Sequence, residues 1–239
     1  MDLVILIFVF CISLLMICNV KIKPIHECGH TLYPPSDTNI RSHSEWTRNH
    51  YRRRIKSFQR KPVQPDSIVL IGDSLTELGG NWSDKLNLPH VYNRGISGDN
   101  TDGVLMRLGE IVCAKPRMVF IMIGTNDLWT NEPAQEVGTK IDSIGTILSE
   151  ELPQMAVYIQ TIMPIESGHD STDRLIRMNE SIRSYKGRGY QIIDTYKEMA
   201  NTNGALPTYF TDDGVHLTEL AYKKWALFLK SQIDKKDSN

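Results

Sequence analysis

This 239-residue sequence has few cysteines and almost no net charge. Its four cysteines (Cys11, Cys18, Cys28 and Cys113) are scattered, so they predict no disulfide framework, and their spacing matches no zinc site. The 27 Lys and Arg residues nearly balance 28 Asp and Glu residues, so the net charge of −1 gives no electrostatic reason to expect nucleic acid as a partner. Internal repeats, a Gly-x-Gly-x-x-Gly loop and a P-loop lysine are also missing, which argues against a nucleotide-binding module.

Residues 1–23 are predicted to be a membrane anchor or a signal segment. From Leu3 to Cys18 every residue is apolar except Ser13, and no charge interrupts the run. As a helix this run would span roughly 24 Å, slightly less than the ~30 Å hydrocarbon core of a bilayer. A cleaved signal peptide usually starts with a basic residue and ends in Ala-x-Ala, and neither feature is present. A buried core helix is the least favoured alternative.

The orientation of that segment is harder to predict. Lys21 and Lys23 follow the apolar run, and the positive-inside tendency would place them, with the rest of the chain, in the cytoplasm. Export is nevertheless the commoner purpose of such a segment. We therefore expect a membrane-anchored or exported protein, in the cell envelope, in the periplasm or secreted.

Residues 24–61 are expected to form a linker followed by a basic amphipathic helix. Pro and Gly among polar residues predict the linker over 24–40, and basic side chains far outnumber the single acid over 41–61. Apolar side chains recur in the second part at helical spacing: Trp46, Tyr51, Ile55 and Phe58. We favour a solvated helix that packs this face onto the domain. A basic surface that contacts anionic lipid is the alternative.

From residue 62 to residue 239, apolar strands alternate with helices. The predicted strands are Ile68–Ile71, Val91–Asn93, Met118–Ile123, Val157–Ile162 and Gln191–Asp194. The predicted helices are Thr101–Cys113, Ala134–Leu152, Asp173–Arg188 and Glu219–Ile233. Apolar strands joined through helices predict a parallel sheet with helices on both faces, a three-layer α/β/α fold.

Residues suited to acyl transfer follow these strands. Ser74 stands where the first strand meets a turn, and a serine hydroxyl becomes a good nucleophile when a histidine takes its proton. His216 precedes the last helix, and Asp213, three residues earlier, is better spaced than Asp212 to orient it. Acyl transfer also needs hydrogen-bond donors for an oxyanion. The Ser74 amide, a glycine amide after the second strand and the Asn126 side chain could supply them.

Other residues near these motifs are given structural roles. Asp73 and Asp127 are expected to hold loops by accepting backbone N–H bonds, and Asp99 is expected to cap the helix that begins near Thr101. The segment from His26 to His30 matches the zinc-protease pattern His-Glu-x-x-His, but nearby Pro and Gly residues prevent the helix that this motif needs. We expect no metal and no cofactor.

The motifs around Ser74, Gly98, Asn126 and His216 resemble the four blocks of the GDSL, or SGNH, hydrolases, over about Ile68 to Leu229. The resemblance implies a flavodoxin-like sheet of five parallel strands, ester hydrolysis without metal, and oxyanion donors from Ser74, Gly98 and Asn126. Residues 1–60 match none of the family's blocks.

Within the family, the segment Asn93–Leu108 is most similar to acetylhydrolases related to platelet-activating-factor acetylhydrolase and to bacterial carbohydrate acetylesterases. The expected substrate is a short-chain acyl ester, first an O-acetyl ester on carbohydrate. The alternatives are a lysophospholipid or platelet-activating-factor-like lipid ester and, less favoured, a binding domain without catalysis.

Overall fold

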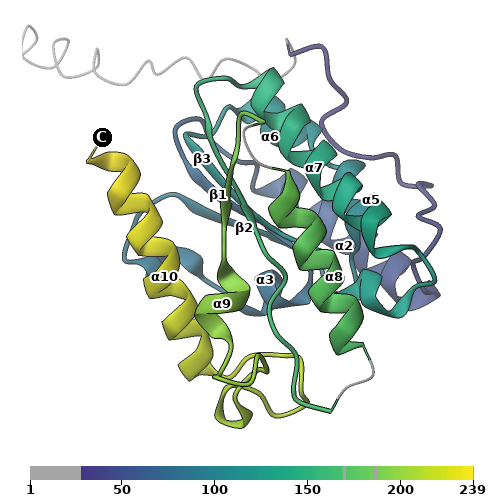
Figure 1. Cartoon of the computed structure of the whole chain (residues 1–239). Coiled ribbons are helices and arrows are strands. Elements are labelled where there is room, and N and C mark those ends of the chain that lie inside the picture. The colour runs from purple at the N-terminus through teal and green to yellow at the C-terminus, as the bar shows by residue number, and fades with distance from the viewer. Residues whose placement is uncertain (1–27, 169–170, 186–187, 239) are drawn as a thin grey trace, which may run out of the picture.

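The computed structural model describes residues 28–168, 171–185 and 188–238 (Figure 1). The segment 1–23, expected to be an anchor or a signal, lies outside these residues. Within the described part of the chain, no helix is both long enough and apolar enough to span a bilayer.

Within the described residues, five parallel strands form one sheet in the order β2-β1-β3-β4-β5. The strands are β1 (Ile68–Gly72), β2 (Val91–Gly95), β3 (Met118–Met122), β4 (Ala156–Gln160) and β5 (Gln191–Ile193). This is the flavodoxin-like order, and it confirms the predicted fold. Ligands bind such sheets beyond the carboxyl ends of the strands, where the strand order reverses, and here the reversal lies between β1 and β3.

Helices cover both faces of the sheet (Figure 1). The helices are α2 (Glu45–Arg60), α3 (Ser74–Leu78), α4 (Trp82–Leu86), α5 (Thr101–Leu105), α6 (Gly109–Ala114), α7 (Ala134–Glu151), α8 (Thr172–Ser184), α9 (Thr195–Met199) and α10 (Glu219–Asp237), with short 3₁₀ turns η2 (Asn126–Trp129) and η3 (Thr208–Phe210).

The core lies on both faces of the sheet, because alternate strand residues point to opposite faces. Val69 and Ile71 join the core cluster under α5–α8, while Ile68 and Leu70 join the cluster under α4, α9 and α10.

The single helix expected over Thr101–Cys113 is two short helices, α5 and α6. Arg107 lies between them, and its buried guanidinium donates to the carbonyl oxygens of Gly72 (2.9 Å) and Arg94 (2.7 Å). A long helix would have competed with this placement of the arginine at the ends of β1 and β2. The sequence pattern contains no signal for such a distant contact.

Helix α2 packs onto the domain, as favoured from the sequence. Tyr51, Ile55 and Phe58 are buried and form a small core with Ile96, but Trp46 is 58% exposed rather than part of this face. The buried stripe instead begins at Thr47, the position four residues before Tyr51. The expected apolar face was therefore wrong at its first residue, because Trp46 lies about 100° around the helix from Thr47.

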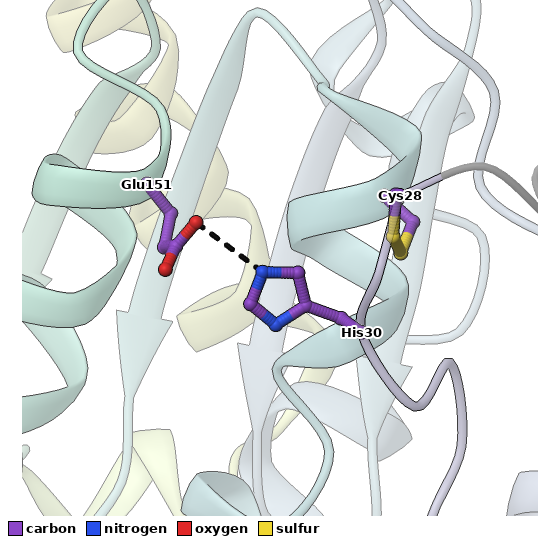
Figure 2. Close-up of a disulfide and its surroundings, with 4 residues drawn as sticks. Cys28, His30 and Glu151 are labelled. Carbon is purple, nitrogen blue, oxygen red and sulfur yellow. Dashed lines mark ion pairs between the residues drawn. A yellow bond between two sulfur atoms is a disulfide. The ribbon is translucent and has the colours of Figure 1, made fainter.

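The segment before α2 is attached to the domain at both ends of its described part. Cys28 forms a disulfide with Cys113 in α6 (Figure 2). Farther along, the Tyr33 hydroxyl donates to Glu110 (3.0 Å), and Ile40 is buried. The scattered cysteines predicted no disulfide framework, and the bond between Cys28 and Cys113 was not anticipated. The partners are 85 residues apart, so only the fold brings them together.

His30, from the zinc-like pattern, makes an ion pair with Glu151 at the end of α7, where the nitrogen–oxygen distance is 3.3 Å (Figure 2). His26 lies outside the described residues. Among the residues that are described, no group of three or more His, Cys, Asp and Glu side chains is placed to hold a metal ion.

Candidate active site

Ser74 lies where β1 ends and α3 begins. The buried strand ends at Gly72, and Asp73 caps the helix by accepting the Leu75 N–H (3.0 Å). A Cβ atom at Gly72 would lie 2.2 Å from the Met122 carbonyl oxygen, so only glycine allows the ends of β1 and β3 to approach this closely. The Ser74 amide is in the first turn of α3, where no carbonyl of the helix accepts from it.

His216 and Asp213 come from the loop between η3 and α10. The Ser74 Oγ lies 3.0 Å from His216 Nε2, and His216 Nδ1 lies 2.6 Å from Asp213 Oδ2. The other carboxylate oxygen, Oδ1, accepts the His216 N–H (2.7 Å) and the Val215 N–H (3.0 Å). The structure thus joins Ser74, His216 and Asp213 in one chain of contacts, although 142 residues separate the serine from the histidine.

The charge on Asp213 is well stabilised. Burial acts to raise the pKa of this carboxyl, but the hydrogen bonds from the His216 side chain and backbone outweigh it and lower the pKa to about 2. Asp213 is therefore ionised across the neutral range. An ionised carboxylate accepts the proton of Nδ1, which leaves Nε2 free to accept a proton from Ser74.

Gly98 and Asn126 follow β2 and β3, the two strands that flank β1 in the sheet. Gly98 has φ +80°, which favours glycine, and a Cβ atom there would lie 2.7 Å from the Thr47 hydroxyl oxygen of α2. The Asn126 Nδ2 donates to the carbonyl oxygen of Asp99, the next residue after Gly98 (2.8 Å). One amide hydrogen of Asn126 thereby fixes the side chain against this loop, and the second hydrogen is available for a ligand.

Two acidic residues hold loops, as predicted. Asp73 accepts from Leu75, and Asp127 accepts the hydroxyl (2.7 Å) and the N–H of Thr101. Burial raises the pKa of Asp127 to about 6 and that of Asp73 to about 7. Both side chains are buried, so they stabilise the loops from the protein interior.

Asp99 does not cap α5, and this prediction was wrong. Asn100 is the cap, and its side chain accepts the Gly103 N–H (3.0 Å). Asp99 is fully buried and instead accepts from Arg107 (2.9 and 3.0 Å), with His43 Nε2 at 3.2 Å. The contacts with the buried Arg107 hold the Asp99 carboxylate toward the sheet rather than toward the N-terminus of α5.

A family model identifies the chain. The model of the GDSL-like lipase/acylhydrolase family matches residues 70–224, a stretch that includes the segments of Ser74, Gly98, Asn126 and His216. The chain belongs to this family. It is a carboxylic ester hydrolase, and its fold is the SGNH hydrolase fold.

Relatives of the esterase extend beyond the matched segment. The human platelet-activating factor acetylhydrolase IB subunit alpha2 is 27% identical over 199 residues, which covers 80% of this chain and 84% of the relative. Among solved structures, a GDSL-like lipase from Bacteroides thetaiotaomicron is similar, with a TM-score of 0.68, 24% identity, and coverage of 78% of this chain and 98% of its own. An acetyl xylan esterase from Geobacillus stearothermophilus has a TM-score of 0.56, 19% identity, and coverage of 71% and 96%.

Sequence reasoning missed several charged residues around the site of the esterase: His43 and Arg107, which are buried, and Glu77, which is partly buried. His43, just before α2, and Arg107, at the α5–α6 junction, both contact Asp99, and Glu77 of α3 contacts His50 of α2. Arg107 could have been suspected, because it is the one basic residue between apolar neighbours in Val104–Leu108. Glu77 and His43 have no local signal, since their partners are distant in sequence.

Proposed function

We propose that the esterase hydrolyses short-chain acyl esters, first among them O-acetyl esters on carbohydrate, with Ser74 as the nucleophile. His216 is the general base, and Asp213 orients it. The observation that carries this proposal is the 3.0 Å contact between Ser74 Oγ and His216 Nε2, with Asp213 on the opposite nitrogen. A nucleophile, a base and an orienting acid in hydrogen-bond reach are what covalent acyl transfer needs.

The proposed reaction has two halves. In the first, Ser74 Oγ attacks the ester carbonyl carbon while His216 Nε2 takes the hydroxyl proton, and negative charge moves to the carbonyl oxygen. The amides of Ser74 and Gly98 and the Asn126 side chain donate to that oxygen. The intermediate then expels the alcohol, which takes its proton from His216. In the second half, water attacks the acyl-serine with the same base, releasing the acid and restoring Ser74.

The exposure of the site favours a small acyl group. The side chains of His216 and Asp213 are 43% and 55% exposed, and no long insertion covers them in the described part of the chain. A long acyl chain would gain little apolar burial in such an open site. The relatives named platelet-activating factor acetylhydrolase subunits are also consistent with an acetyl group.

The alcohol part of the substrate is proposed to be a carbohydrate because the 3₁₀ turn that begins with Asn126 also lines a polar groove. We call it the Trp129 groove; its volume is about 550 Å³ and it begins in η2, three residues after Asn126. Trp129 is half exposed. The other lining residues are Arg41, Ser42, Asp102, Thr130, Asn131, Glu132, Glu136 and Lys140. An aromatic side chain among polar groups suits a sugar ring better than an alkyl chain.

Two substrate panels test this proposal. Hydrolysis should be fastest on p-nitrophenyl acetate, slower on the butyrate and slowest on the octanoate. Acetylated xylan should then be a better substrate than an acetyl phospholipid of the platelet-activating-factor type, which is the alternative. Trp129→Ala should raise KM on the acetylated sugar and leave p-nitrophenyl acetate unchanged. Preference for the octanoate, or for the phospholipid with no effect of Trp129→Ala, would reject the carbohydrate proposal.

We also propose that the esterase works outside the cytoplasm, membrane-anchored or exported. Disulfides persist in oxidising compartments and are rare in the cytosol, so the Cys28–Cys113 bond supports export. Alkylation of the protein from its native cells, without reductant, should leave both cysteines unmodified. Full alkylation of Cys113 would place the domain in a reducing compartment.

A further inference from the structure

Glu77 lies on the same short helix as Ser74, one turn later. Its side chain is 16% exposed and sits between α3, α2 and the loop that follows β2. The family model begins at residue 70, so it includes Glu77 but not α2. Nothing in the acyl-transfer chemistry requires a carboxylate at this position, so the residue needs a separate explanation.

The carboxylate of Glu77 holds the residue before Gly98. Its Oε2 accepts both the N–H of Ser97 (2.6 Å) and the Ser97 hydroxyl (2.8 Å). One end of this link is therefore in the helix that begins with Ser74, and the other end is next to Gly98. These are the segments that supply the two backbone donors of the proposed oxyanion hole.

Helix α2 holds the same carboxylate from the other side. His50 Nε2 lies 2.8 Å from Oε2, and Arg54 Nε lies 3.2 Å from Oε1. Arg54 also donates twice to the Gly95 carbonyl oxygen at the end of β2 (2.9 and 3.1 Å). His50 Nδ1 is 3.3 Å from the Arg53 guanidinium, which suits a ring that donates from Nε2 to Glu77.

These contacts keep Glu77 ionised. Burial acts to raise the pKa of its carboxyl, but the hydrogen bonds from His50 and Ser97, with the charge of Arg54, leave the pKa below its ordinary value. An unpaired carboxylate near a developing oxyanion would oppose catalysis. The guanidinium of Arg54 offsets that charge, so the link can be strong without an electrostatic cost to the transition state.

We propose that Glu77 is a positioning residue of the oxyanion hole, which fixes the Gly98 amide relative to the Ser74 amide and is itself held by His50 and Arg54 of α2. The inference rests on the proposed function. It also makes α2 part of the catalytic apparatus. Thr47 of the same helix occupies the space beside Gly98 that a Cβ atom would need, so α2 supports this loop at two points.

The test compares Glu77→Ala and Glu77→Gln with the wild-type esterase on p-nitrophenyl acetate. Removing one oxyanion donor typically costs about 10²–10³ in turnover, and a donor that is present but loosely held should cost less. We expect Glu77→Ala to lower kcat by about 10- to 100-fold and to change KM less than about threefold. Glu77→Gln keeps an acceptor oxygen for Ser97 and should recover most of the activity.

A second readout separates positioning from general damage. Phenylboronic acid forms a tetrahedral adduct with an active-site serine and places an oxygen in the oxyanion hole, so its inhibition constant should rise in Glu77→Ala in proportion to the loss of kcat. Ser97→Ala keeps the backbone N–H and should have a smaller effect. The double variant Glu77→Ala/Ser97→Ala should be no worse than Glu77→Ala alone, because both changes remove one link.

Glu151→Ala is the matched control, since it removes another His–Glu pair, that with His30, at the far end of the sheet. It should leave kcat unchanged. If Glu77→Ala does not fold, Ser97→Ala carries the test, because it removes one of the two hydrogen bonds to Glu77 and should lower kcat and raise the boronate inhibition constant in the same proportion. A kcat within twofold of wild type in a folded Glu77→Ala, or a change in KM only, would overturn the inference. Failure of the proposed function would be detected separately, as ester hydrolysis by folded Ser74→Ala enzyme.

Discussion

In the proposed mechanism, Asn126 uses its two amide hydrogens for two different tasks. One hydrogen fixes the side chain on the Asp99 carbonyl (2.8 Å), and the other is free for the oxyanion. Asn126→Ala should therefore lower kcat by about 10²–10³-fold with little change in KM, as measured on p-nitrophenyl acetate. A change confined to KM would make Asn126 a ground-state binder of the substrate instead. Asn131→Ala, in the neighbouring loop, is the control and should not affect kcat on this substrate.

Asp73 makes stability depend on pH. Burial raises its pKa from 3.8 to about 7 in the folded protein, so the native state holds this proton more tightly than the unfolded state does. Stability from this group is complete below the unfolded value near pH 4 and is lost as pH rises toward about 7. Asp73→Asn keeps an acceptor for Leu75 and cannot ionise.

We expect Tm of the wild-type esterase to fall more between pH 4.5 and pH 7.5 than Tm of Asp73→Asn. Thermal unfolding followed by circular dichroism measures this, with the exposed Asp84→Asn as the control. The same Tm change with pH in both proteins would show that Asp73 does not bind the proton.

At this scale the sequence predicted residues that follow strands and could not predict those held by distant partners. Ser74 and Asn126 follow apolar strands, and the end of each continuous apolar run locates them. Glu77 and Arg107 contact residues outside their own helices. The apolar neighbours of Arg107 could indicate that it is buried, but no local pattern predicts the partner of either residue. The prediction that Asp99 caps α5 was wrong for the same reason, because its partner Arg107 follows α5 in the chain.

Among the elements, α2 shows that the buried face of a helix cannot be predicted from its large apolar residues alone. Thr47 occupies the first buried position of the stripe, since its methyl and hydroxyl fit against Gly98 where an indole would not. Phe58 lies at the other end, with the guanidinium carbons of Arg94 and Arg54 4.5 and 4.9 Å from its ring centroid. Its burial attaches the helix to the domain.

Phe58→Ala should destabilise the protein by about 3–5 kcal/mol, because a buried ring and two cation contacts are lost. The urea midpoint of unfolding measures this loss. Leu227→Ala is the matched control on α10, where the side chain is 72% exposed, and should change stability by less than about 0.5 kcal/mol. Equal midpoints for wild type and Phe58→Ala would mean that α2 is not docked as described.

At the scale of the whole molecule, the disulfide and the proposed active site lie at opposite ends of the parallel strands. Cys113 is near the end of α6, which leads into the amino end of β3, whereas Ser74 follows the carboxyl end of β1. The parallel sheet was predictable from alternating strands and helices, and its flavodoxin-like order was implied by the family resemblance. The pairing of Cys28 with Cys113 was not, because it depends on the path of the chain before α2.

Cys113→Ser should therefore lower stability and spare catalysis. Closing a loop of 85 residues is worth about 4–5 kcal/mol in the chain-entropy model, which sets the scale of the expected loss in unfolding free energy. At 25 °C, kcat/KM on p-nitrophenyl acetate should stay within about twofold of wild type. Loss of kcat in a Cys113→Ser protein that remains folded would contradict the separation of the disulfide from the proposed active site.

The central claim is that Ser74 attacks the ester, and replacing it tests this most directly. Ser74→Ala removes the nucleophile at the first residue of α3, so turnover of p-nitrophenyl acetate and labelling by a fluorophosphonate probe should both disappear while the circular dichroism spectrum and Tm stay unchanged. Ser149→Ala, which removes a hydroxyl bonded only within α7, should behave as wild type. Substantial turnover by folded Ser74→Ala enzyme would contradict the account.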